Sequence, residues 1–406
     1  MTVFTRNALL LTAEKASHLL GALALMILVA RRLGPDILAD YGFVISVTAF
    51  FLPLIDVGLN TRVIKASASR EERGGSAFDE AVGYRIAVSP ASLALMVGCG
   101  LAWGRTPAVD LTVLLVGLST VAMSLGDTAN SVFKGLQRSG YSFGLIGALN
   151  VVLLVSVFAV LERGGGLPEI GACYLVARLL YAFAAFYLAH TRAGVSVPSI
   201  RPSFHLRVVV DGLFHLPAPY FLGNVLAIAY TATYVALGEA AAGPYYVGYR
   251  AAAAVFILVS AGFEALLASA TADRAVGLGQ SAGTTFAVLA IGGGIGLYAV
   301  APIAPLLFGD SFSGSVVAVR VLALCVPPFA FVGLAYTLLI GYDQQRGATY
   351  SMLILLGITT VGSIAAAYAM GALTTAAVPT LATLFLSAVF WMQLKRSRRS
   401  SDTALT

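Results

Sequence analysis

The sequence predicts an all-α polytopic membrane protein, and three features of the chain support this. Twelve apolar stretches follow one another, each near the length of about 20 helical residues that crosses the hydrocarbon core of a bilayer. The 406 residues are 59% hydrophobic and 11% charged, whereas a soluble domain has about 25% charged residues. The apolar runs at 19–30 and 352–360 do not alternate with polar residues, as the strands of an outer-membrane barrel would.

The predicted spans group into two bundles of six helices around a central cavity. We expect the spans at about 8–30, 39–60, 80–103, 109–133, 141–161, 170–190, 212–237, 244–270, 282–303, 314–341, 348–368 and 375–394. The segment 191–211 is polar and contains two prolines, which indicates a cytoplasmic linker. The chain then divides into an N-terminal bundle at 1–190, this linker, a C-terminal bundle at 212–394 and a basic tail at 395–406.

Basic residues in the loops predict the orientation. One set of loops contains sixteen of them, namely Arg6, Arg62, Lys65, Arg70, Arg73, Lys134, Arg138, Arg192, Arg201, Arg207, Arg274, Arg346, Lys395, Arg396, Arg398 and Arg399. The opposite loops contain four, namely Arg31, Arg32, Arg105 and Arg163. Lys and Arg concentrate in cytoplasmic loops, so both termini are expected in the cytoplasm. The net charge of +6 is then explained by contact with anionic membrane lipids and not by nucleic acid.

The two halves contain similar loops at matching places. Leu33-Gly34 opens the first outer loop, and Leu237-Gly238 opens the outer loop between the seventh and eighth spans. The connection GLQRSG at 135–140 corresponds to GYDQQRG at 341–347. We expect a six-plus-six repeat related by an axis along the membrane normal.

Several motifs resemble one known family. These are RLGPD at 32–36 with Tyr41-Gly42, LIDVGL at 54–59, VGY at 247–249, and LFGDSF at 307–312 followed by VLAL at 321–324. Their order and spacing resemble the Wzx-type polysaccharide flippases of the multidrug/oligosaccharidyl-lipid/polysaccharide exporter superfamily. The resemblance implies a multi-pass transporter of the bacterial inner membrane that moves undecaprenyl-diphosphate-linked oligosaccharide from the inner to the outer leaflet by alternating access.

The resemblance has one departure and several further implications. The seventh helix of the family often carries an Asp before the outer loop, whereas this chain has YTATY at 230–234, which puts ion coupling at that place in doubt. The expected partners are the lipid-linked oligosaccharide, membrane lipids, and a polysaccharide polymerase with its chain-length regulator. The expected processes are O-antigen, lipopolysaccharide or exopolysaccharide biosynthesis.

Arginines within the spans are the candidate substrate-binding residues. A guanidinium stays protonated, and its planar fork matches phosphate oxygens. Arg178 lies near the middle of the sixth span, where it either contacts the diphosphate or sugar or forms a structural ion pair. Arg250 and Arg320 lie near the outer ends of the eighth and tenth spans, and Arg85 lies near the inner end of the third. These three either bind substrate or extend to the interface.

Acidic and aromatic residues give a second set of candidates. Glu14, Lys15 and His18 cluster in the first span, and Glu14 and His18 share a helix face because they are four residues apart. They form either a proton relay or gate, or a cluster at the inner interface. Asp127 and Glu264, late in the fourth and eighth spans, are candidates for proton or ion coupling or for pairing with arginines.

Tyr234 is the aromatic candidate for sugar stacking. The alternative is an interfacial belt formed by the tyrosines of the seventh and eighth spans. The glycine-rich stretch GGGIG at 292–296 lies inside an apolar span, so close helix packing explains it and a phosphate-binding loop does not.

Three functions differ in what they require. A flippase needs cations for the diphosphate. A multidrug or other small-molecule exporter of the same fold would favour carboxylates in its cavity, and a polyprenyl-linked glycosyltransferase would need acidic residues on a large outer loop. The charged residues near the middle of the spans are mostly arginine, and the outer loops are short. We therefore expect a flippase and no enzyme, with no metal or cofactor other than an H⁺ or Na⁺ gradient, and we keep the exporter as the alternative.

Overall fold

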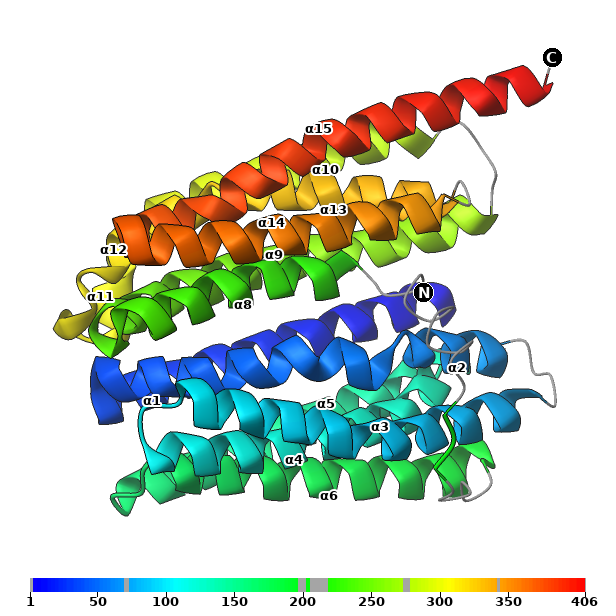
Figure 1. Ribbon diagram of the computed structural model, residues 1–406. Helices are drawn as coiled ribbons and strands as arrows, with labels where there is room; N and C mark the ends of the chain where they lie inside the picture. The colour runs from blue at the N-terminus through cyan, green and yellow to red at the C-terminus, as the bar shows by residue number, and fades with distance from the viewer. Residues whose placement is uncertain are drawn as a thin grey trace. The chain divides into compact units, whose positions relative to one another are not determined.

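The computed structural model describes residues 3–68, 73–195, 202–204, 218–272, 278–341 and 344–405, and contains no strand among them. It divides into two compact helical units (Figure 1). Unit 1 contains Met1–Arg32 and Val47–Leu216, and unit 2 contains Leu33–Ser46 and Pro217–Thr406. The predicted linker, 191–211, lies partly outside the described residues.

The helices match the predicted spans. Ten helical regions are long and apolar enough to cross a membrane. The first, Leu9–Asp56, contains two predicted spans, because Gly34 interrupts the helix with φ 83° and ψ −179° and the chain reverses direction there (Figure 1). A shorter apolar helix, Phe221–Leu237, stands at the seventh predicted span. The all-α fold class predicted from the sequence is therefore confirmed.

Unit 1 is organised around one helix. Its elements are α1 (Val3–Asp56, apart from Leu33–Ser46), α2 (Leu59–Ala68), α3 (Arg73–Trp103), α4 (Pro107–Gly135), α5 (Ser139–Glu162) and α6 (Leu167–Ala193). Helix α4 packs against α2, α3, α5 and α6, and most extensively against α6. Polar residues on α4 are thus placed to reach several neighbouring helices.

The ends of α4 and α6 follow from local sequence. The side chain of Thr106 caps α4 by accepting from the Val109 N–H at 3.4 Å, and Pro107 begins the helix. At the start of α6, the side chain of Glu169 accepts from the Gly166 N–H at 2.9 Å. Both devices satisfy backbone groups that the first turn of a helix leaves without partners.

Unit 2 contains more helical segments than predicted. They are α8 (Ala218–Leu237), α9 (Glu239–Ala272), α10 (Leu278–Val300), η1 (Ala301–Ile303), α11 (Ala304–Phe308), η2 (Asp310–Phe312), α12 (Ser315–Ala323), α13 (Val326–Gly341), α14 (Gln345–Met370) and α15 (Ala372–Leu405). The predicted span 314–341 is two helices, α12 and α13, separated at Leu324 and Cys325 just before two prolines. Proline lacks a backbone N–H and so favours such a break.

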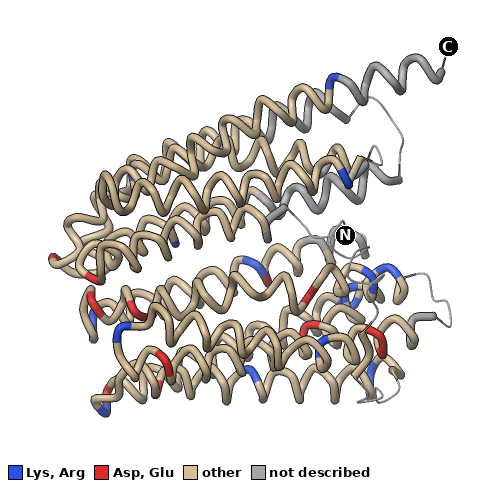
Figure 2. The backbone as a smooth tube through the Cα atoms, viewed as in Figure 1, with Lys and Arg blue, Asp and Glu red and all other residues tan. Residues whose placement is uncertain are grey.

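Three boundaries differ from those expected. Helix α1 ends at Asp56 instead of about residue 60, because Val57 and Gly58 have positive φ values of 42° and 71°. The outer loop expected from residue 238 reduces to Gly238 between α8 and α9. The segment 395–405, expected as a separate tail, continues α15. Figure 2 shows Lys, Arg, Asp and Glu concentrated towards the helix ends in each unit, with few along the middle.

Candidate functional site

A buried ion pair and its hydrogen bonds join four helices of unit 1. Arg85 on α3 is 0% exposed and pairs with Asp56 at the end of α1. Its guanidinium also donates to the Ser124 carbonyl oxygen at 2.7 Å and to the Asn60 side chain at 3.0 Å. Burying two charges is costly unless they pair and their remaining groups are bonded. Any contact of Arg85 with substrate, as the sequence suggested, requires this network to open.

A second buried carboxylate binds a lysine. Glu14 on α1 is 7% exposed. It accepts from Lys134 Nζ at 2.8 Å and from the Ser142 hydroxyl, so it links α1 to α4 and α5. His18 is exposed and Lys15 is half-buried. The contacts of Glu14 with the other two helices were not foreseen from the sequence.

Asp127 on α4 has a different environment. Its carboxylate accepts from the Tyr181 hydroxyl of α6 at 2.6 Å. Among the described residues, no Lys or Arg lies within ion-pair distance of it. Gly126 allows this approach, because a Cβ there would meet the Tyr181 ring at 2.6 Å. Nearby, the buried Asn130 Oδ1 accepts no hydrogen bond from any described residue.

Arg178 on α6 is half-buried and faces α4. It donates to Ser119 Oγ at 3.0 Å and to Thr120 Oγ1 at 3.1 Å, and its Cζ lies 4.9 Å above the Tyr174 ring. Both hydroxyls donate their own protons to the Val116 carbonyl oxygen, so their oxygens are available as acceptors. Both of these hydroxyl contacts are with neutral groups of α4.

Tyr234 lies inside a cluster of aromatic side chains in unit 2. It is 0% exposed, donates to Asp40 Oδ1 at 2.6 Å, and stacks on Phe43 with ring centroids 4.4 Å apart. Tyr230 donates to the Ala39 carbonyl oxygen. The contacted residues all belong to Leu33–Ser46, which unit 2 contains although the flanking chain belongs to unit 1.

Gly42 is essential to this packing. A Cβ on Gly42 would lie 2.6 Å from both the Tyr230 hydroxyl and the Tyr246 ring. The segment therefore approaches α8 and α9 more closely than any other residue would allow. Sequence reasoning left Tyr234 either in an interfacial belt or stacked on sugar, and in this structure its hydroxyl donates to Asp40 and its ring stacks on Phe43.

The remaining candidates are dispersed. Arg250 lies half-buried on α9, and Arg320 lies half-buried on α12 with its Cζ 5.2 Å above the Tyr298 ring. Glu264 lies in α9, but its side chain is outside the described part of the structure. The described residues contain no cluster of three or more His, Cys, Asp or Glu suited to a metal.

Comparison with known proteins identifies the architecture. No protein-family model and no curated protein sequence matches the chain. The inward-facing conformation of a multidrug resistance MATE family transporter of the MOP superfamily matches with a TM-score of 0.68 and 17% identity, over 95% of this chain and 96% of that one. Its outward-facing conformation matches with a TM-score of 0.67 and 15% identity, over 99% and 96%.

This chain has the MATE-like fold. A MOP superfamily transporter from Pyrococcus furiosus Vc1 matches with a TM-score of 0.63 and 13% identity, over 98% of this chain and 96% of that one. The likeness covers nearly the full length of each chain, and the low identity limits it to the fold. The two six-helix halves expected from the sequence agree with the MATE-like fold, whereas flippase specificity stays a prediction.

The first prediction concerns the buried pair of unit 1. Replacing Arg85 with Ala leaves the Asp56 carboxylate buried without its cation, and we expect a loss of about 3–5 kcal/mol in unfolding free energy. Denaturation in mixed micelles of dodecyl maltoside and SDS measures this. The matched control is Arg62→Ala, because Arg62 is 40% exposed where it pairs with Glu80 and exposed pairs contribute about 0–1 kcal/mol. Equal losses in both variants would contradict the prediction.

The second prediction concerns the tyrosine cluster. Gly42→Leu places a side chain where Tyr230 and Tyr246 now lie, so Leu33–Ser46 cannot remain seated on α8 and α9. We expect Gly42→Leu to be proteolysed faster than the wild type. A cysteine introduced by Ala39→Cys should also be labelled faster in Gly42→Leu, because Ala39 is 0% exposed in the native structure. Gly140→Leu is the control, since a Cβ there meets no heavy atom within 4 Å. Unchanged labelling in Gly42→Leu would show that the close approach is not required.

Proposed function

We propose that the protein is a flippase of the bacterial inner membrane, with both termini in the cytoplasm. In this proposal it moves an undecaprenyl-diphosphate-linked oligosaccharide from the inner to the outer leaflet by alternating access. The support comes from the fold, from the motifs that resemble Wzx-type flippases, and from the charges within the spans. A polymerase and a chain-length regulator would then receive the product.

The observation that carries the proposal is the pairing of the buried carboxylates. Asp56 is neutralised by Arg85, and Glu14 is neutralised by Lys134. An exporter of organic cations would need carboxylates that are available to its cargo, and of Asp56, Glu14 and Asp127 two are held by cations. The spans also contain Arg178, which donates to two neutral hydroxyls and whose planar guanidinium is a group suited to phosphate oxygens.

A specific observation favours a second function, multidrug export. Two of the matching structures are conformations of a multidrug resistance MATE family transporter. A third MOP superfamily transporter is described as having a binding pocket of reverse polarity that suggests a different function. The structural neighbours therefore fit the exporter better than the flippase, although the differing polarity of their pockets does not exclude the flippase.

The third prediction tests the cargo. In a bacterial host that lacks its own flippase, we expect the wild-type chain to restore surface polysaccharide. We expect Arg178→Ala to reduce it at least about tenfold, the effect of removing one charge-assisted contact, and Arg178→Lys to restore it in part because lysine lacks the planar fork.

The control for this experiment is Arg163→Ala, because Arg163 is an exposed residue between α5 and α6. It should behave as wild type at equal expression. Normal polysaccharide with Arg178→Ala would overturn the role of Arg178. Failure of the wild type to restore polysaccharide, together with increased drug resistance of the expressing cells, would favour the exporter.

We further propose that a proton gradient drives transport and that Asp127 carries the proton. Among the described residues Asp127 is bonded to a tyrosine hydroxyl and to no cation, whereas Glu14 is held by Lys134. A carboxylate without a counter-cation in a span is suited to bind and release a proton. The side chain lies partly buried on α4, the helix that packs against most of unit 1.

The fourth prediction follows from this assignment. In proteoliposomes, we expect Asp127→Asn to abolish stimulation of flipping by a pH gradient and to retain slow equilibration without a gradient. Tyr181→Phe is the matched control, because it removes the hydrogen bond but keeps the carboxylate, and should preserve part of the stimulation. Persisting stimulation in Asp127→Asn, or stimulation by a sodium gradient alone, would exclude this role.

A further inference from the structure

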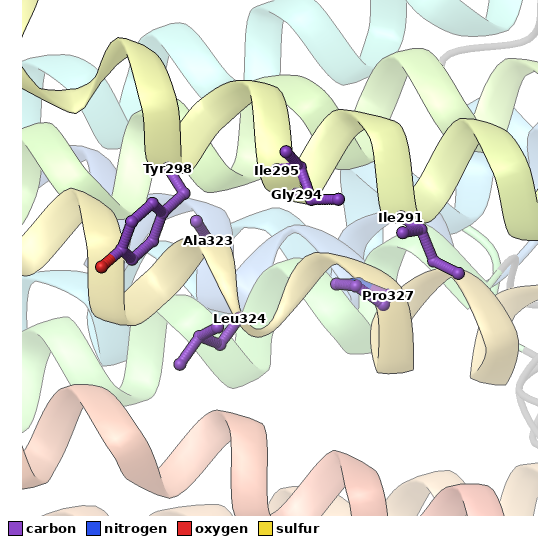
Figure 3. A pocket seen from close by; sticks show the side chains of 7 residues that line it. All are labelled: Ile291, Gly294, Ile295, Tyr298, Ala323, Leu324 and Pro327. Carbon is purple, nitrogen blue, oxygen red and sulfur yellow. The ribbon is translucent and has the colours of Figure 1, made fainter.

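An apolar groove runs along the surface of unit 2 between α10 and the junction of α12 with α13 (Figure 3). Its volume is about 240 Å³, and Tyr298 contributes the one polar side chain of its lining. Ile291, Ile295 and Leu324 border it and are 51–65% exposed. Exposed aliphatic side chains within a span face hydrocarbon, so the groove is a surface for an apolar chain.

The local sequence creates this groove. Gly294 on α10 has no side chain, and a Cβ there would lie 3.2 Å from the Ala323 carbonyl oxygen and 3.3 Å from the Pro327 ring. The backbone of α10 therefore approaches the place where α12 ends and α13 begins. Close approach at one glycine and larger residues on either side leave a channel along the helices.

A cation lies at one end of the groove. Arg320 is on α12, about one turn before the lining residues Ala323 and Leu324, and its Cζ lies 5.2 Å above the ring of Tyr298. Its Nε is buried and has no hydrogen-bond partner among the described residues. A guanidinium in a membrane span requires an anionic or polar partner, and the described protein provides only the ring.

Arg320 is the one charged residue of the helices that form the groove and of the adjoining α11. Helices α10, α11, α12 and α13 contain no other Lys or Arg and no Asp or Glu. One guanidinium matches the single negative charge of a phosphodiester. In addition, the bordering side chains of Ile291, Ile295 and Leu324 are exposed, which leaves the groove open on the surface of unit 2.

We infer that this groove binds an anionic glycerophospholipid, with one acyl chain along Ile291, Ile295 and Leu324 and the phosphate on Arg320. A cation–π contact with the Tyr298 ring holds the Arg320 guanidinium at the end of the groove. The loop charges predict that this end faces the outer leaflet. The inference does not depend on the cargo of the transporter, because the groove takes a component of the surrounding membrane.

The fifth prediction is a change in lipid retention. Native mass spectrometry of the purified full chain, mixed with phosphatidylglycerol or phosphatidylcholine, measures the bound lipid. We expect the wild type to retain phosphatidylglycerol at least about tenfold better than Arg320→Gln, the scale of one charge-assisted hydrogen bond. Arg320→Lys should retain an intermediate amount. Arg105→Gln is the control, since Arg105 is exposed between α3 and α4, and should retain the wild-type amount.

A second variant tests the acyl chain separately. Ile295→Trp fills the groove at an exposed position and keeps Arg320, so we expect the same loss of phosphatidylglycerol with an unchanged elution profile in gel filtration. Equal retention by wild type and Arg320→Gln would overturn the inference, as would equal retention of phosphatidylcholine. Binding of polyprenyl diphosphate with no binding of phosphatidylglycerol would also overturn it, because the groove would then serve the cargo.

Discussion

The cost of placing a charge in hydrocarbon governs the interior of this protein. Lipid offers no water to a carboxylate or a guanidinium, so each charged side chain in a span must meet another polar group. Asp56, Glu14 and Asp127 meet this requirement in three ways, through an arginine, a lysine and a tyrosine hydroxyl. The same three contacts connect helices of unit 1, so the solution to the charge problem also determines how those helices pack.

Small residues have a comparable effect where helices approach one another. Gly42 brings Leu33–Ser46 against the tyrosines of unit 2, and Gly294 brings α10 against the junction of α12 and α13. Helices in lipid gain little from the hydrophobic effect and depend on close contact instead. Gly42 thus allows Leu33–Ser46 to reach Tyr230 and Tyr234. Gly294 lies in the lining of the apolar groove between α10 and the α12–α13 junction.

Apolar length and turn residues were sufficient to predict the fold, but not the contacts of the candidate site. The similar loops at Gly34 and Gly238 proved to be turns with φ of 83° and 86°, as matching sequences suggest. Glu14 was expected to share a face with His18, yet its contacts come from helices more than a hundred residues away. Helical periodicity reveals neighbours within one helix and is uninformative about packing between helices.

The sign of the charges also constrains the cargo. A cationic drug at Asp56 would have to compete with Arg85, and one at Glu14 with Lys134, whereas Asp127 is held by a tyrosine hydroxyl. Arg178 differs from these pairs in that it donates to two neutral hydroxyls, those of Ser119 and Thr120. Under the proposed function, an anionic diphosphate would add a charge-assisted contact at this guanidinium.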